Sequence, residues 1–497
     1  MIKKYIALCF IVITTRAFAQ QDPTALKYAE IINTEDLKGN LSIIASDAME
    51  GRETGKRGQK MAAAFIAAYF EDLGLTGPVN GGHYQPVPLF TTGVPTVVLK
   101  SGTTEFTKED YFYAGSFETG GLIDMPVIFI GGGTEEEIKS MDLNGKAVMF
   151  ISDPSATNVN NALVRTLRDK GAKMVFAVIE KTDDYKRITS MMSNFSGGRL
   201  SLTKQTGPGG NTGLFYVSAT TAGKMFNSTF EKLKKASADK KLDKIKPSTV
   251  SMSIVQNYRD VKSENILGFL EGTDKKDELV VITAHYDHIG ISPRAEGDKI
   301  NNGADDDGSG TVSVLSIAKA FVQAKKEGKG PRRSILFMTV TGEEKGLLGS
   351  RYYTDINPVY PLASTVVNLN IDMIGRKDPG HKDSAPYVYV IGSDKLSSEL
   401  HTLSEATNKT YTNLIFDYTY NDEKHPDRIY YRSDHWNFAK NNVPIIFYFD
   451  GVHEDYHKPS DEVDKIEFDL LAHRAKAVFH TAWEIANRDG RLVVDKK

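Results

Sequence analysis

The chain has 497 residues, of which 61 are Lys or Arg and 64 are Asp or Glu, so its formal net charge is −3. This mildly acidic balance, without a long block of basic residues, argues against nucleic-acid binding. The one cysteine, Cys9, lies in the leader-like segment described next, which excludes structural disulfides, thiolate zinc sites and a cysteine nucleophile from the mature protein and leaves His, Asp and Glu as metal ligands.

Residues 1–19 have the pattern of a signal peptide. Two lysines precede a mostly apolar run over 5–14, and residues 17–19 form the small-x-small pattern at which such leaders are cleaved. The apolar run is too short to cross a hydrocarbon core of ~30 Å. We therefore expect a mature chain that begins near Gln20, has no transmembrane segment and is exported, either to the periplasm or out of the cell.

The texture of the sequence changes twice along the chain. Apolar residues at helical spacing predict helices within 36–74. Short strand-like runs separated by turns follow, with one helix predicted at 161–170. Further on, apolar strands alternate with helical patterns such as 310–326 and 468–486, which is typical of a mostly parallel sheet covered by helices.

We therefore expect an α/β fold in two domains, because one domain usually has roughly 100 to 200 residues. Residues 20–97 and 256–497 are predicted to form a discontinuous catalytic domain with a mostly parallel mixed sheet sandwiched by helices. Residues 98–255 are predicted to form a smaller, β-rich insert. Active sites in open α/β sheets lie outside the carboxyl ends of the strands, so the strand ends are where chemistry is expected.

The first two candidate segments carry a histidine and a group of acids. His285 and Asp287 end the run ELVVITAHYDH, and they share one face if the strand continues, so that the carboxylate can orient the imidazole. On its own this pair also fits a surface or core-capping histidine. The loop NNGADDDGSG at 301–310 contains three consecutive acids that are costly to bury without a cation, although a solvated, helix-capping loop fits it equally well.

Three more segments complete the pattern. Glu343 and Glu344 are adjacent in TGEEKGLLGS, and neighbouring side chains at a strand end point in different directions, so one can bind metal while the other acts as a general base. Asp372 lies in an apolar strand context, where an unpaired carboxylate is costly, and His457 follows the strand predicted at 444–449. Oxygen and nitrogen ligands from five segments fit a two-metal hydrolase. No H-E-x-x-H helix of the thermolysin type is expected.

The motifs AHYDH, GADDDGSG, TGEEKGLLGS, NIDMIG and YHKPSD together resemble those of metallopeptidase family 28, the di-zinc aminopeptidases and glutamate carboxypeptidases. The resemblance covers the chain from Asp36 to about Ala486. The stretches GKAV at 145–148 and KGA at 170–172 resemble the protease-associated domain, a β-rich module inserted in several exported peptidases.

The family resemblance implies a role for each motif residue. It implies that His285 and Asp372 hold one zinc ion, that Glu344 and His457 hold the other, and that Asp305 bridges them. Further implied roles, position by position, are a general base at Glu343, an imidazole-orienting partner at Asp287, a cis peptide bond between Asp305 and Asp306, and substrate contacts by Arg432 and Tyr456. Of four further histidines, His435 and His453 are expected to be structural, and His288 and His425 are expected to have no functional role.

The implied function is that of an exported exopeptidase, in the first place an aminopeptidase, with two Zn²⁺ per subunit, or Co²⁺ or Mn²⁺ in their place, and peptides as partners. A carboxypeptidase of the same family is an alternative, because Arg432 can hold a terminal carboxylate. A one-zinc glutaminyl cyclase agrees less well with two complete ligand sets. A receptor or binding protein requires the ligand set to be idle.

Overall fold

The computed structural model describes residues 21–496, except for 116, 140, 154, 156, 196–198, 205–211 and 294–295. The predicted signal peptide at 1–19 lies outside the described residues. The chain divides into two compact units: the first comprises the chain up to Val87 and from Lys262 onward, and the second is Pro88–Val261.

The second unit is wider than the insert predicted at 98–255. Its boundaries fall within two long strands, β1 (Tyr84–Thr92) and β11 (Tyr258–Leu270). A domain boundary inside a strand is not marked by turn residues or by a linker composition. The sequence therefore predicts both boundaries inside the true limits of the insert, at 98 and 255.

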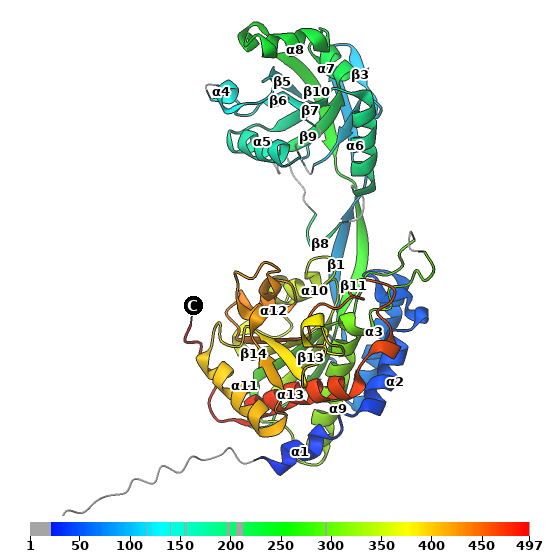
Figure 1. The fold of residues 1–497 in the computed structure, drawn as a ribbon, viewed down its shortest axis with the longest axis vertical. Coiled ribbons are helices and arrows are strands. Elements are labelled where there is room, and N and C mark those ends of the chain that lie inside the picture. Colours follow the sequence, from blue (N-terminus) through cyan, green and yellow to red (C-terminus); the bar gives the residue numbers. More distant parts are fainter. Residues whose placement is uncertain are drawn as a thin grey trace, which may run out of the picture. The chain divides into compact units, whose positions relative to one another are not determined.

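The first unit is built on a twisted sheet with the strand order β16-β15-β17-β14-β12-β13-β11-β1 (Figure 1). The short strand β8 (Leu200–Ser201) belongs to the second unit and pairs with Phe90 and Thr91 of β1, which also belong to it. Its centre is parallel: β12 pairs with β13 on one side and β14 on the other, and β14 pairs with β17. Every residue of β13, β14 and β17 is buried, as expected for parallel strands between two helical layers. The remaining bounds are β12 (Lys275–His285), β13 (Arg333–Val340), β14 (Thr365–Ile371), β15 (Tyr387–Ile391), β16 (Ile415–Asp417) and β17 (Ile445–Phe449).

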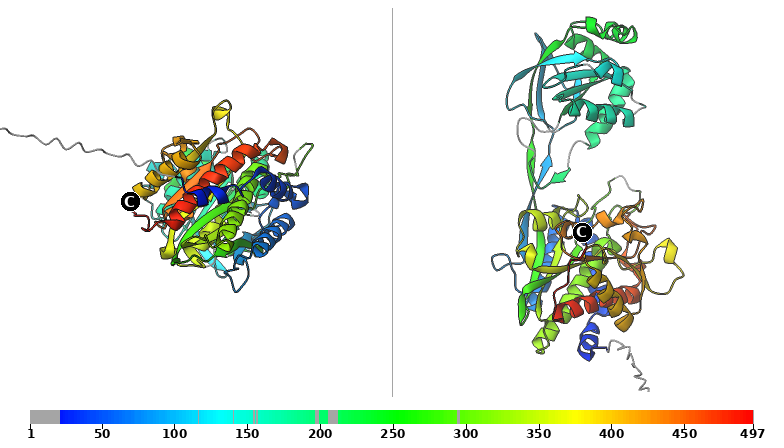
Figure 2. Two further views of the ribbon diagram at one scale, coloured as in Figure 1. Left: turned by 90° about the horizontal axis from the view of Figure 1, so that it is seen from below. Right: turned by 90° about the vertical axis from the view of Figure 1, so that its left-hand side faces the viewer.

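Helices cover both faces of this sheet, which confirms the predicted α/β class. They are α1 (Pro23–Ala29), α2 (Thr34–Ile44), α3 (Arg57–Leu73), α9 (Gly310–Lys326), α10 (Leu348–Arg351), α11 (Ser398–Tyr411), α12 (His435–Ala439) and α13 (Phe468–Asn487). Helices α9 and α13 lie side by side on one face (Figure 2). Along β12, Val280 and Ile282 pack into the core on that face, whereas Leu279 and Val281 pack into the core on the other. This alternation is the period of two that a strand imposes.

The second unit has its own sheet, with the order β3-β2-β10-β5-β6-β7-β9-β4. The sequence predicts a β-rich insert, and the structure has β-α-β connections as well, because α5 links β6 to β7 and α6 follows β7. The strands are β2 (Thr96–Ser101), β3 (Thr104–Phe106), β4 (Tyr111–Tyr113), β5 (Ile123–Phe129), β6 (Ala147–Ser152), β7 (Met174–Ile179), β9 (Gly213–Ser218) and β10 (Ser248–Val255). The helices are α4 (Glu135–Ile138), α5 (Thr157–Asp169), α6 (Thr182–Phe195), α7 (Ala219–Met225) and α8 (Phe230–Ala238).

Within the described ranges, no helix is both long enough and apolar enough to span a bilayer.

Candidate metal centre

His285 is the last residue of β12, at the carboxyl end of the central parallel strands, and it is 1% exposed. Its Nδ1 lies 2.9 Å from the carbonyl oxygen of Asp287. A proton on Nδ1 is satisfied by that carbonyl, which leaves Nε2 unprotonated as a ligand atom. Burial lowers the pKa of His285, but the carboxylates of Asp372 and Glu343 outweigh burial and raise it well above the ordinary value. The pocket therefore favours a positive charge at this point.

Asp306 lies between two histidines. Its Oδ1 is 3.2 Å from Nε2 of His285, and its Oδ2 is 3.1 Å from Nε2 of His457. The side chain is buried, and burial raises its pKa, but His288, His285 and His457 bring the pKa well below the ordinary value. A carboxylate with one oxygen toward each histidine is arranged to bridge two cations.

Asp372 lies beside His285, and Glu344 lies beside His457, so each of the two histidines near Asp306 has a second carboxylate close to it. Asp372 follows β14, and its Oδ1 is 3.5 Å from Nε2 of His285, while its Oδ2 accepts a hydrogen bond from Ser433 at 2.6 Å. Glu344 follows β13, and its Oε2 is 3.2 Å from Nε2 of His457. Burial and Asp306 raise the pKa of Glu344, but two histidines outweigh them and lower it to about 2.

The structure brings four of the five predicted ligands together and replaces the fifth. Asp305, expected to be the bridge, points away: its Oδ1 accepts the backbone N–H of Gly375 at 2.7 Å, and its Oδ2 lies 3.1 Å from Nε2 of His453. Asp306 occupies the central place instead. The predicted cis peptide bond is likewise wrong by one residue, because the cis bond joins Asp306 to Asp307.

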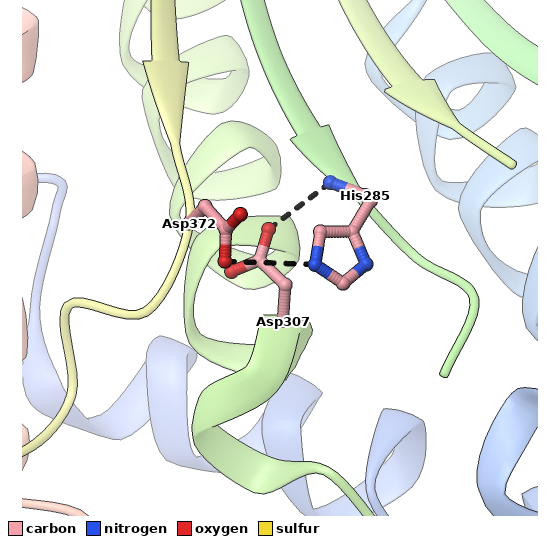
Figure 3. Close-up of side chains that lie close together, drawn as sticks. All are labelled: His285, Asp307 and Asp372. Atoms are coloured by element: carbon pink, nitrogen blue, oxygen red, sulfur yellow. Dashed lines mark hydrogen bonds and ion pairs between the residues drawn. The ribbon is translucent and has the colours of Figure 1, made fainter. Parts of the chain in front are cut away.

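The carboxylate of Asp307, the third acid of the loop, accepts hydrogen bonds from backbone N–H groups. Its Oδ2 accepts the N–H of His285 at 3.0 Å, and its Oδ1 accepts the N–H groups of Met373 and of Gly310, the first residue of α9. Figure 3 shows its carboxylate beside that of Asp372, with the dashed hydrogen bond from the backbone N–H of His285. Asp307 therefore ties β12, β14 and α9 together and caps the helix, which is the role that the capping interpretation gave to the whole loop.

Arg52 contacts the backbone directly before the same loop. No role was predicted for this residue from the sequence. Its guanidinium is fully buried and donates to four backbone carbonyl groups, those of Ile44, Tyr286, Asn302 and Gly303. Burial lowers the pKa of Arg52, and the nearby acids, Asp306 first, raise it in part. The arginine fixes the backbone at Tyr286, just after β12, and at Asn302 and Gly303, just before the acidic loop, and adds a positive charge near the acids.

Glu343 and Asp287 lie beside the cluster. Glu343 Oε2 is 4.0 Å from Nε2 of His285, and burial, with Asp372 and Glu344 adding to it, raises the pKa of Glu343 well above the ordinary value. The Asp287 carboxylate is 4.0 Å from the His285 ring and accepts hydrogen bonds from Thr54 and from the backbone N–H of Glu343. The predicted orienting contact with His285 is thus made by the Asp287 backbone, while its carboxylate positions Glu343.

Arg432 and Tyr456 both line a pocket in the first unit that reaches the cluster. Arg432 Nη2 donates to the Tyr456 hydroxyl at 3.3 Å, and the Tyr456 ring stacks on His457 with the centroids 3.9 Å apart. Burial and the nearby acids raise the pKa of Tyr456, so its hydroxyl stays protonated. The apolar part of the pocket wall consists of Met373, Ile429, Phe447, Phe449 and Val452.

The other histidines divide into two groups. His435 is buried against Phe447, with Nε2 at 2.8 Å from the Tyr430 carbonyl, and His425 packs edge-on against Tyr420 away from the cluster. His288, to which the sequence gave no role, is fully buried, and its Nδ1 is 2.8 Å from Oε1 of Glu344. Its position three residues after His285 is the one signal that marks it.

Residues 453–457 read H-E-D-Y-H, the letters of a single-zinc peptidase motif. That motif needs a helix to place both histidines on one face, and here the segment is a non-helical turn. His453 contacts Asp305, whereas His457, at a φ of 57°, contacts Asp306 and Glu344. The two histidines therefore serve different carboxylates.

The residue types and their burial fit a metal site. Oδ2 of Asp306 and Oε1 of Glu344 are buried without a hydrogen-bond partner in the described structure, and buried carboxylates in this state need a cation. Two groups of imidazole and carboxylate atoms lie within 4.8 Å of one another, one of His285, Asp307 and Asp372 and the other of His288, Asp306 and Glu344. Nitrogen and oxygen donors of this kind suit zinc.

Comparisons with known proteins agree with this geometry. Residues 265–482 match the model of Peptidase family M28. A "Probable leucine aminopeptidase" of Arthroderma otae is 31% identical over 235 residues, 45% of this chain and 58% of that protein. "Aminopeptidase YwaD" of Bacillus subtilis is 26% identical over 247 residues, 48% of each chain. The chain thus spans about half the length of these relatives.

A solved structure, "Aminopeptidase from Aneurinibacillus sp. strain AM-1", matches 95% of this chain and 98% of its own with a TM-score of 0.51 and 19% identity. At this identity the match shows a shared fold.

Proposed function

Residues 265–482 belong to peptidase family M28, and from this premise we propose that the protein is a zinc-dependent aminopeptidase that removes single residues from the N-termini of peptides. The observation that carries the proposal is the convergence of five side chains at the carboxyl ends of β12, β13, β14 and β17 and on the loops that follow these strands. These side chains are His285, Asp306, Glu344, Asp372 and His457.

The ligands divide into two sets that share one carboxylate. We propose that His285 and Asp372 hold one Zn²⁺, that Glu344 and His457 hold the other, and that Asp306 bridges them. Bound zinc ions polarise a scissile carbonyl and lower the pKa of water. Cobalt or manganese can take the same donors.

The chain's own residues supply the proton transfers. Glu343 faces the same space as the ligands, and burial raises its pKa, which makes its carboxylate a stronger base. In this proposal it takes the proton of the attacking water and gives it to the leaving amine. The Asp287 carboxylate holds the Glu343 backbone in place, and the protonated Tyr456 hydroxyl is placed to donate to the carbonyl oxygen of the substrate.

The pocket supports an aminopeptidase with an apolar preference. Its wall of Met373, Ile429 and Phe447, with two further apolar residues, suits an uncharged side chain. Acidic residues at its base suit a free α-ammonium group. The alternative is a carboxypeptidase, and the observation that keeps it is Arg432 in the same pocket, where a guanidinium can pair with a terminal carboxylate.

Peptides of one sequence with either the N-terminus or the C-terminus blocked distinguish an aminopeptidase from a carboxypeptidase and from a binding protein. We expect hydrolysis of a leucyl anilide and of leucyl peptides with a blocked C-terminus, no hydrolysis of the same peptides with an acetylated N-terminus, and loss of activity on chelation with recovery on added zinc. Cleavage of N-acetylated peptides with a free C-terminus would show a carboxypeptidase. A protein that binds zinc but turns over neither set would be a binding protein.

We also propose that residues 1–19 direct export of the protein. The second unit, Pro88–Val261, resembles the protease-associated domain in its motifs, and we propose that it restricts the length of the substrate. Replacing this unit by a short linker should raise the rate on a decapeptide relative to a dipeptide. An unchanged ratio in a folded, zinc-loaded variant would contradict the restriction.

A further inference from the structure

His288 is a buried imidazole with no satisfied ring nitrogen. It lies three residues beyond His285, is 0% exposed, and its backbone N–H donates to the carbonyl of Arg52 at 3.2 Å. Neither Nδ1 nor Nε2 has a hydrogen-bond partner within the described residues. A neutral imidazole always carries one donor and one acceptor nitrogen, so this burial is costly unless something else occupies one of them.

Two unsatisfied oxygens face the same ring. Nδ1 of His288 is 2.8 Å from Oε1 of Glu344 and 3.8 Å from Oδ2 of Asp306. Both oxygens are themselves buried without a hydrogen-bond partner in the part of the chain that the structure describes. The 2.8 Å pair is close enough for a hydrogen bond but is not directed as one. One nitrogen and two oxygens thus meet with no proton placed between them, which is the arrangement of ligand atoms around a cation.

The second histidine of this side lies close by. The rings of His288 and His457 are edge to face with centroids 5.7 Å apart, and Nε2 of His457 is 3.1 Å from the same oxygen of Asp306. Two ligand atoms of one tetrahedral zinc ion are separated by about 3.4 Å, given zinc distances of roughly 2.0 to 2.2 Å to nitrogen and oxygen. The observed separations bracket that value.

We infer that His288 is a ligand, through Nδ1, of the metal ion that Asp306, Glu344 and His457 hold. This inference rests on the proposed two-metal function and deepens it. The two sites then differ: the site of His285 and Asp372 has one imidazole, and the site of Glu344 has two. The extra donor makes the Glu344 site the one that keeps its ion longer when metal is scarce.

The direct test uses the full chain with histidine labelled with nitrogen-15 and both sites loaded with an NMR-active cadmium isotope. We expect scalar coupling to cadmium at ring nitrogens of three histidines, with the coupling at one of them lost in His288→Gln. Coupling at only two histidines in a protein that carries two cadmium ions would overturn the inference and leave the proposed function intact. Fewer than two ions per chain would overturn the two-metal proposal itself.

A chelator titration with elemental analysis tests the same point by affinity. His288→Gln and His288→Leu should both bind one of the two ions at least ~10-fold more weakly than the unmodified protein. If His288 only donated a hydrogen bond to Glu344, Gln would replace it and only the Leu variant would weaken binding. His480→Gln is the matched control, because His480 also has a buried Nδ1 without a partner but lies in α13 beside Tyr411, and its zinc affinity should be unchanged.

Discussion

Asp305 and Asp306 are adjacent in the chain, yet their carboxylates face different histidines. Oδ2 of Asp305 lies 3.1 Å from Nε2 of His453, and Oδ2 of Asp306 lies 3.1 Å from Nε2 of His457. The backbone N–H groups of both aspartates point at the carboxylate of Asp461, which fixes the turn between them. One acid therefore belongs to the scaffold and the other to the candidate metal centre.

The variants Asp305→Asn and Asp306→Asn should therefore differ in zinc content and in activity. Asp306→Asn removes the anionic ligand that we propose the two zinc ions share, so we expect fewer than two zinc ions per chain and loss of activity. Asp305→Asn keeps an oxygen that can accept the N–H of Gly375 and should keep both ions, with some loss of stability. Elemental analysis of both purified variants checks this. Full zinc content in Asp306→Asn with a deficit in Asp305→Asn would restore Asp305 as the bridge.

The adjacent glutamates should also differ. Glu343→Gln keeps the shape but removes the base, so kcat should fall by ~10²- to 10⁴-fold while zinc content stays the same. Glu344→Gln removes an anionic ligand, so zinc content and the thermal midpoint should fall along with activity. Zinc analysis beside steady-state kinetics decides between them. A Glu343→Gln protein that lost an ion while Glu344→Gln kept both would mean that the roles are reversed.

Arg52 should be a stability residue. Arg52→Met leaves four backbone carbonyl groups without their donor, and each unsatisfied buried group costs roughly 1 to 3 kcal/mol. We expect the free energy of unfolding to fall by at least about 3 kcal/mol in urea titrations of the zinc-loaded protein. The control is Arg57→Met, whose guanidinium pairs with Glu50 at the surface with its side chain 74% exposed, and it should leave the unfolding curve in place. Equal curves for both variants would contradict the role of Arg52.

His480 should make stability depend on pH. Burial, with Lys476 adding to it, lowers its pKa to about 4. Its unfolded value is about 6.5, so the unfolded state binds the proton first as the pH falls. The stability that the neutral ring contributes is therefore complete above pH 6.5 and is lost toward pH 4, on the order of 3 kcal/mol.

His480→Phe tests this with a ring that still stacks on Tyr411 but does not titrate. The difference in unfolding free energy between the variant and the unmodified protein should shift in favour of the variant between pH 7 and pH 4. A difference that stays constant over this range would show that His480 does not change its pKa on folding.

The fold class could be predicted because each buried parallel strand is a continuous run of mostly apolar residues in the sequence. β13, β14 and β17 are buried at every residue, and each is followed by a polar segment that supplies a candidate ligand. The helix α6 was not predicted: residues 182–195 are mostly polar, although their few apolar residues, such as Tyr185, Ile188 and Met192, recur at helical spacing.

The candidate site could be predicted by segment but not always by residue. The run of three aspartates does not say which carboxylate faces the histidines, since that depends on the turn Ala304–Ser309 and on its contact with Asp461. His288 lies beyond the end of β12, where strand alternation no longer predicts a direction. The histidine-orienting role of Asp287 is performed by its backbone, which no side-chain pattern reveals.

The interrupted first unit has a consequence for the order of assembly. The side chain of Asn257 donates to the carbonyl of Val94, 163 residues earlier, and the N–H of Gly93 donates to the carbonyl of Asn257. Both contacts lie inside the second unit, so this unit can close its loop before the first unit is complete. Closing a loop of that length costs about 4 to 5 kcal/mol of chain entropy. A second unit that folds early removes this cost for α1, α2 and α3, which must join a sheet made almost entirely from the later half of the chain.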